Sequence, residues 1–314
     1  MLAPNLPVLS AKPVLDIPFF PFVYFPDRLA TIRSYEKSYP YWVPTETEVA
    51  IPAYPYESSL LLNNDVLAFY GHPNSTRMGI LGRYTIEDLA DRLNKLAAEY
   101  RNVSGGRGVI TAFYIIYGTV WPGGDIGIIG EENLMRYINY ALEHDMLVFI
   151  DHQIGRYDPV DSLKTMFPYL RYPNVHLALD PEWRTTRPMK EIGSVSADEI
   201  NRAQRAMEEY IIQNKLPGDR MLVIHQFNVK MIKNRAAVTS GLRTVRLVHC
   251  ADGFGSPFLK RDSYASNALA LSMPIKGFKL FYNFGIPGAG YDSPLLTPKD
   301  VYNLTPRPYL IMYQ

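Results

Sequence analysis

Cysteine is almost absent from the sequence. Cys250 is the only one among 314 residues, so the chain cannot form a disulfide within itself. A zinc site built from several thiolates is excluded for the same reason. Cys250 lies inside a short apolar run, which indicates a buried thiol of little reactivity.

The sequence also lacks an excess of either charge and any long hydrophobic run. It has 32 Lys and Arg against 31 Asp and Glu and no basic stripe, so we expect neither nucleic acid nor an anionic membrane as its main partner. No run of about 18 apolar residues is present, so we expect no transmembrane segment. Residues 1–4 show no basic region followed by an apolar one, so we expect either a cytoplasmic protein or a mature form without its leader.

Proline and tyrosine, in contrast, are plentiful, with 25 and 23 residues. The prolines crowd the first 60 residues, where they are interleaved with Phe, Tyr and Trp. A flexible linker would favour Gly and Ser and avoid aromatic residues. The apolar content of 47% also excludes disorder for most of the chain. We therefore predict an ordered, irregular arm over residues 1–65 that packs on the globular body.

A repeated pattern follows the predicted arm. Short apolar runs, rich in β-branched and aromatic residues, alternate with helical segments. Most of the runs are continuously apolar, as expected for strands buried on both faces of a parallel sheet. There are eight of them, over residues 66–72, 109–117, 147–153, 175–182, 221–227, 246–252, 277–283 and 309–314.

Helix-start signals precede several of the segments between these runs. Thr85, Asp158 and Thr297 suit N-caps, and Ser196 with Glu199 forms a capping box. Eight strands alternating with helices predict an α/β fold, a single (β/α)₈ TIM barrel over residues 66–314. The alternative, a doubly wound open sheet, would carry a glycine-rich turn after its first strand, and none is present. Because the last run ends at Gln314, no eighth helix follows, and we expect the arm to cover that gap.

Two carboxylates stand out at the end of the fourth predicted strand. The active site of such a barrel lies at the carboxyl ends of the strands, where Asp180 and Glu182 share a face with Ala178 because alternate residues point the same way. Two close carboxyl groups cannot both ionise at their usual pKa, so one can hold a proton as a general acid, and removing the charge of Asp180 would lower the pKa of Glu182. The alternative is structural, with Asp180 capping the next loop and Glu182 pairing with Arg184 or Arg187.

Other polar residues at strand ends complete the predicted site. Asp151 is the third catalytic candidate, as nucleophile, base or charge partner. Lys279 lies in a buried run and needs an anionic partner if it points inward, or could form a Schiff base. Aromatic rings suit stacking on sugars, and imidazole and amide groups suit hydrogen bonds to hydroxyls. The predicted substrate-binding set is Tyr70, His72, Trp183, His225, Gln226, His249, Asp252, Lys279, Tyr282 and Asn283, and Tyr114 is a further candidate for stacking.

The Asp180-Pro-Glu182 motif resembles the strand-four motif of barrel glycoside hydrolases of the chitinase and lysozyme type. That resemblance implies that Glu182 protonates the glycosidic oxygen while Asp180 orients Glu182 or stabilises the neighbouring charge. The longer acidic motif of chitinases is absent, since Asn174, His176 and Ala178 stand in its place.

A wider set of segments resembles a bacterial barrel family whose members often look secreted or lipoprotein-like. They are residues 151–155, 177–184, 225–227 and 252–255. The resemblance brings no activity with it, but it favours an extracytoplasmic location, secreted or surface-anchored, over a cytoplasmic one.

Our working hypothesis is a glycosidase-like hydrolase that acts on a polysaccharide or cell-wall glycan without a cofactor or metal. One alternative is a metal-dependent hydrolase that uses histidines and aspartates at strand ends, namely His72, Asp151, His225, His249 and Asp252. Against it, the first strand lacks His-x-His and the last offers no terminal Asp. A second alternative is a non-catalytic barrel that binds a saccharide or another protein. The sequence leaves the oligomeric state open.

Overall fold

The structure is a computed structural model, and it describes residues 60–314. The expectation of an arm packed on the barrel concerns residues 1–65 and so falls, except for its last six positions, outside the described residues. Those six belong to the barrel: Leu60–Leu62 form a 3-10 turn and strand β1 begins at Asn64. The side chains of Leu60 and Leu61 are buried with those of the barrel interior.

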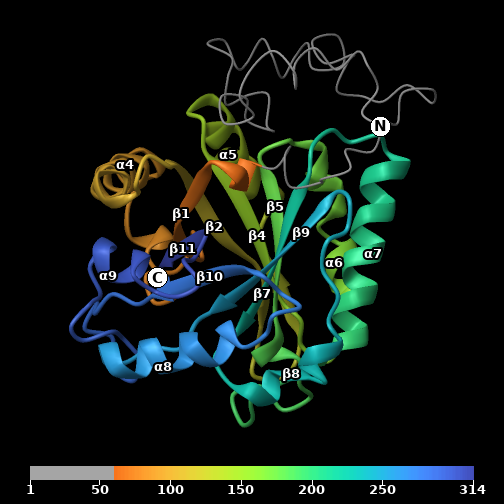
Figure 1. Cartoon of the computed structure of the whole chain (residues 1–314). Helices are drawn as coiled ribbons and strands as arrows, with labels where there is room; N and C mark the ends of the chain where they lie inside the picture. The colour runs from red at the N-terminus through yellow and green to blue at the C-terminus, as the bar shows by residue number, and fades with distance from the viewer. Residues whose placement is uncertain (1–59) are drawn as a thin grey trace, which may run out of the picture.

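Eight parallel strands close into a barrel, as the sequence predicts (Figure 1). Neighbours follow the order β1-β11-β10-β9-β7-β5-β4-β2, and β2 pairs with β1 to complete the ring. The strands are β1 (Asn64–Gly71), β2 (Gly108–Val120), β4 (Leu147–Gln153), β5 (Val175–Asp180), β7 (Arg220–Gln226), β9 (Val245–Ala251), β10 (Ile275–Leu280) and β11 (Leu310–Tyr313). All eight predicted runs are confirmed as strands.

Three short strands and one strand end differ from the prediction. β3 (Ile126–Ile128) forms a hairpin with the end of β2, and β6 (Val195–Ser196) pairs with β8 (Ile232–Lys233) outside the barrel. Runs of two or three residues are too short to show a periodicity. The fourth predicted strand ends at Asp180 rather than 182, because Pro181 opens a 3-10 turn, Pro181–Trp183.

Helices cover the outside of most of the barrel (Figure 1). They are α4 (Ile86–Val103), α5 (Glu131–Glu143), α6 (Pro159–Lys164), α7 (Ala197–Gln213), α8 (Pro257–Ala268) and α9 (Pro298–Tyr302). The predicted caps are confirmed: the side chains of Thr85, Asp158, Ser196 and Thr297 each accept a hydrogen bond from the first helical turn. The described connection between β7 and β9 contains only 3-10 turns, Val229–Met231 and Arg235–Ala237, and the short strand β8.

Side chains alternate between two apolar layers along each strand. On β1, Val66, Ala68 and Tyr70 belong to the barrel interior, whereas Leu67 and Phe69 pack under the helices. The same alternation on every strand decides which polar side chains face the interior at the carboxyl ends.

Tyrosines pack the outer face of the last strand of the barrel, β11. Tyr100 of α4 and Tyr313 of β11 share a hydrogen bond of 2.8 Å between their hydroxyls. Tyr302 of α9 meets the Tyr100 ring edge-on at 5.1 Å, and the Tyr282 ring stacks on Tyr313 at 5.2 Å. Helix α9 also packs against α4, so these two helices and the tyrosines between them cover the outer face of β11.

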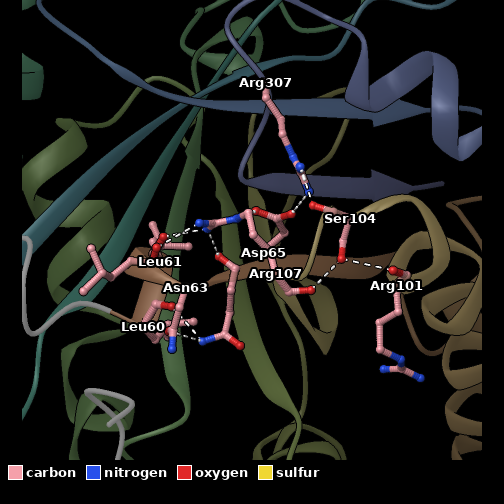
Figure 2. A network of polar contacts seen from close by, with 10 residues as sticks. Leu60, Leu61, Asn63, Asp65, Arg101, Ser104, Arg107 and Arg307 are labelled. Atoms are coloured by element: carbon pink, nitrogen blue, oxygen red, sulfur yellow. Dashed lines mark hydrogen bonds and ion pairs between the residues drawn. The ribbon is translucent and has the colours of Figure 1, made fainter. Parts of the chain in front are cut away.

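A polar network ties the first two strands to the segment before the last one, at the amino ends of the strands (Figure 2). Asp65 is buried and pairs with Arg107 at 2.9 Å and with Arg307. Arg107 also donates to the carbonyl oxygens of Leu61, Leu62 and Asn64, and Arg307 donates to that of Ser104 at 2.8 Å. The carboxylate of Asp65 therefore holds together the seam at which the barrel closes.

The variant Asp65→Asn tests this seam. The carboxylate is 1% exposed and its two arginines are 24% and 30% exposed, so its loss should cost about 2 kcal/mol, between the values for surface and buried ion pairs. Chemical denaturation measures the free energy of unfolding. The matched control is Asp198→Asn, which breaks an exposed pair with Arg202 and should change stability little. Equal losses of unfolding free energy in the two variants would show that the Asp65 network stabilises the protein no more than an exposed ion pair does.

Candidate active site

Polar side chains converge inside the barrel at the carboxyl ends of its strands. They come from β1, β4, β5, β7 and β10 and from the residues that follow β5 and β9. All of them are buried except Glu182, which is partly exposed. We call this group the acidic centre: Asp151, Asp180, Glu182 and Asp252, with Tyr70, His225 and Lys279.

His225 links two aspartates of the centre. Its Nδ1 lies 3.2 Å from Oδ2 of Asp252, and its Nε2 lies 3.5 Å from Oδ2 of Asp151. The hydroxyl of Tyr114 lies 2.8 Å from the same Nε2, and the hydroxyl of Tyr70 donates to Asp151 at 3.1 Å. The imidazole and two phenols therefore fix the orientation of Asp151 and Asp252. Tyr114, which the sequence suggests only for stacking, acts here through its hydroxyl.

Several buried carboxyl oxygens in the centre have no hydrogen-bond partner among the described residues. They are one oxygen each of Asp151, Asp180 and Asp252. Burial of a polar atom without a partner costs free energy, so such atoms occur rarely in structural networks. These oxygens are available to accept hydrogen bonds from a bound molecule.

Burial and mutual repulsion set the protonation of the carboxyl groups. Burial, then the negative charges of Glu182 and Asp151, hold the pKa of Asp180 well above its usual range. Burial, then the charge of Asp252, raises the pKa of Glu182 to about 7, against the opposing charges of Lys279 and His225. Burial also disfavours ionisation of Asp252, but the hydrogen bond and charge of His225 outweigh it and leave the pKa of Asp252 below its usual value. The centre thus combines an Asp180 whose protonated form is favoured, an Asp252 whose ionised form is favoured and a Glu182 that exchanges its proton near neutral pH.

The relation between Asp180 and Glu182 differs from the expectation. Because Glu182 lies in the turn after β5, the two side chains do not share a strand face. The charge that raises the pKa of Glu182 comes from Asp252, and Glu182 in turn acts on Asp180. The structural alternative does not hold either: Asp180 makes no capping hydrogen bond, and the two arginines proposed as partners of Glu182 pair with other glutamates.

Two predicted binding residues point away from the centre. Gln226 and His249 lie in the layer between the sheet and the helices, where His249 Nε2 is 2.8 Å from Oε1 of Gln226. Nδ1 of His249 lies 3.3 Å from Nζ of Lys276, and Gln226 also accepts from Arg235. Adjacent residues of a strand face opposite sides, so Gln226 cannot join His225 in the interior.

The remaining predicted residues surround the centre at larger distances. Trp183 lies in the turn after β5, partly exposed, and its hydrogen bond lowers the pKa of Glu182. His72 lies half-buried in the loop after β1, where its Nδ1 accepts from the backbone of Asn74. Tyr282 and Asn283 line a solvent-open pocket of about 350 Å³ together with Arg77, Phe281, Tyr291 and Gln314. The ring of Phe281 lies 5.2 Å from Nζ of Lys279, so this pocket adjoins the centre.

Lys260 and Asp292 form a buried pair that the sequence did not indicate. Lys260 is buried, donates to the carbonyl oxygens of Gly253 and Lys279, and lies 3.4 Å from Asp292. Asp292 accepts from the backbone of Phe281 at 3.0 Å. This pair joins the loops after β9 and β10, and nothing in the local sequence indicates it, because its members come from distant segments.

Of the residues of the metal alternative, Asp151, His225 and Asp252 meet in the acidic centre, whereas the two other histidines lie elsewhere. His225 faces the interior and His249 the outer layer. Within residues 60–314, no group of three or more His, Cys, Asp or Glu side chains is arranged to hold a metal ion. In the same part of the chain, no helix has the length and apolarity that a membrane span requires.

Comparisons with known proteins identify likenesses in fold alone. No family model matches the chain, and no curated protein matches it in sequence. Similar solved structures include an oxaloacetate acetylhydrolase, with 15% identity over 81% of this chain and 78% of that one, at a TM-score of 0.45. A GH18 chitinase from Flavobacterium johnsoniae has 9% identity over 80% and 87%, at 0.44. A GH26 domain of an endo-beta-mannanase/endo-beta-glucanase from Prevotella bryantii has 7% identity over 80% and 84%, at 0.42. Likenesses this distant assign no activity to the chain.

The source of the raised pKa of Glu182 can be tested by NMR titration of its carboxyl carbon. Because the charge of Asp252 raises that pKa, Asp252→Asn should lower it from about 7 toward the usual value. Asp180→Asn is the matched control and should leave the pKa of Glu182 near 7, because the charges that raise this pKa do not include that of Asp180. A fall in Asp180→Asn with no change in Asp252→Asn would contradict this assignment.

Proposed function

We propose that the protein is a glycosidase-like hydrolase in which Glu182 is the general acid and base. The observation that carries the proposal is the arrangement of the acidic centre. A partly exposed carboxyl, Glu182, lies at the mouth of the barrel with three buried aspartates, each with one oxygen that lacks a hydrogen-bond partner among the described residues. Hydrolysis of a glycosidic bond requires such a pairing of a protonated carboxyl with ionised ones.

Each carboxyl group then has a role that follows from its protonation. With a pKa of about 7, Glu182 carries a proton part of the time at neutral pH and can pass it to the glycosidic oxygen as the bond breaks. Asp252, held ionised beside His225, stabilises the positive charge that develops on the sugar ring. Asp180, held protonated, can donate a hydrogen bond to the substrate.

Exposed aromatic side chains support a carbohydrate as the substrate. Trp121, Tyr157, Phe254 and Tyr291 are exposed, and all lie in connections that follow barrel strands and therefore on the same end as the centre. Aromatic rings there can stack on the apolar faces of sugars, while the negative centre favours neutral hydroxyl-rich molecules over anions. A polysaccharide substrate would agree with the sequence-based expectation of a bacterial protein outside the cytoplasm.

The burial of the centre favours a second candidate, a barrel that binds a saccharide without cleaving it. Asp151 and His225 are fully buried, so a glycan would contact only Glu182 and the surrounding loops unless the mouth opens. Turnover by the wild-type protein distinguishes the two functions.

Glu182→Gln tests the proposal. The amide keeps the shape and hydrogen bonding of the side chain but has no proton to transfer, so turnover should fall by roughly 10² to 10⁴-fold while binding persists. Release of reducing sugars from a panel of bacterial wall and plant polysaccharides measures it. The wild-type rate should also decline as the pH rises through about 7, because the acid form of Glu182 is lost there.

The control is Glu191→Gln, a change in the same loop at an exposed glutamate that pairs with Arg187. Its activity should match that of the wild type. Retained turnover in Glu182→Gln would refute the catalytic role of this residue, and binding without turnover by the wild type on every glycan would favour the binding barrel.

A further inference from the structure

Three lysines are buried in the described part of the chain. Lys260 and Lys276 are each 1% exposed and Lys279 is 4% exposed. Burial of an ammonium group is costly unless hydrogen-bond acceptors or a counter-charge surround it. The three lysines can therefore be compared by what their amines contact.

Two of the three have a full set of acceptors. Lys276 donates to the carbonyl oxygens of Asn267 at 2.7 Å and Ala270 at 2.9 Å, which end helix α8. Lys260 donates to the carbonyl oxygens of Gly253 and Lys279 and pairs with Asp292. Both amines have structural roles: Lys276 ties β10 to the end of α8 and the turn after it, and Lys260 ties α8 to the end of β10 and to the loop after it.

Lys279 differs from both. Among residues 60–314 its amine donates no hydrogen bond and forms no ion pair. It lies 3.6 Å from the centre of the Tyr70 ring, on the interior side of β10. The carboxyl groups of the acidic centre are near enough for its charge to act on Asp151, Glu182 and Asp252, yet none contacts it directly. An amine without a hydrogen-bond partner, on a buried lysine beside carboxyl oxygens that also have none among the described residues, indicates a site for a molecule that joins them.

We infer that Lys279 is a nucleophile that forms an imine with a small neutral aldehyde or ketone bound in the acidic centre. An anionic ligand is disfavoured there, because the surrounding side chains include several carboxylates. A carbonyl compound places an electrophilic carbon at the amine and an oxygen toward the carboxyl groups. This activity uses the same site as the proposed hydrolysis but does not depend on it.

The step balances with the groups present. The ammonium of Lys279 gives a proton to a carboxylate of the centre, and the neutral amine attacks the carbonyl carbon to form a carbinolamine. The carbinolamine nitrogen then gives a second proton to a carboxylate of the centre. The carbinolamine oxygen receives both of these protons and leaves as water. Ammonium and carbonyl compound thus become iminium and water with the net charge unchanged, so the carboxylates that stabilise the first cation also stabilise the second.

Tyr70 has a positioning role in this inference. Its ring holds the amine from one side, and its hydroxyl donates to Asp151 at 3.1 Å. Because the ring supplies no hydrogen-bond donor, it holds the ammonium in place and leaves the lone pair of the deprotonated amine free to attack.

Reductive trapping tests the inference. The full-length protein is exposed briefly to glycolaldehyde with sodium cyanoborohydride, which reduces an imine to a stable secondary amine, and the modified lysines are mapped by peptide mass spectrometry. We expect label on Lys279 before it appears on the exposed Lys299, and none on Lys260 or Lys276, whose amines are fully bonded. The wild-type map alone decides the question, because it requires no variant to fold.

Two variants test whether the early label depends on Lys279. Lys279→Arg keeps the positive charge but cannot form the imine, so the early label should be lost, while Lys299→Arg should leave label on Lys279 unchanged. Thermal melting checks that both variants are folded. If Lys279→Arg does not fold, Lys279→Met replaces it as the variant that cannot form the imine. Labelling of Lys299 with Lys279 unmodified would overturn the inference, whatever the outcome of the glycan assays.

Discussion

Closure of the barrel is the constraint on which the site depends. The pairing of β1 with both β2 and β11 brings the carboxyl ends of eight strands around one narrow interior. Every second residue near those ends must point into that space. Asp151, His225 and Lys279, which are distant in sequence, meet there only because the ring closes. The Asp65 network at the opposite end of the strands secures the same seam.

The acidic centre lowers the stability of the folded protein. Apolar side chains fill the middle of the barrel, whereas the carboxyl ends of its strands hold four carboxyl groups, three of them buried, together with the imidazole of His225 and the amine of Lys279. His225 and Lys279 offset part of the repulsion, yet burial still holds the pKa of Asp180 and Glu182 above their usual values. A fold that only needed stability would place apolar residues at these positions. Retention of charge there is what a site for acid-base chemistry requires.

The sequence predicted the barrel well because its signals are local: continuous apolar runs for the strands and capping residues such as Ser196 for the helices. It predicted the centre in part. The alternation of side chains along a strand, applied to His225 and to His249, separates the residue that faces the interior from the one that faces the helices. The influence of Asp252 on Glu182 could not be predicted, because it depends on how two loops from different strands approach each other. Lys260 and Asp292 were missed for the same reason.

The central claim is that the fold holds Glu182 at a raised pKa at the expense of stability. Unfolding free energies of the wild type and Glu182→Gln, measured by denaturation across pH, test it most directly. A carboxyl whose pKa is raised from about 4.3 to about 7 by folding destabilises the folded state progressively as the pH rises between those values. The account predicts equal stability near pH 4 and a Gln variant more stable by about 3 kcal/mol near pH 8. A wild type as stable as the variant near pH 8 would contradict it.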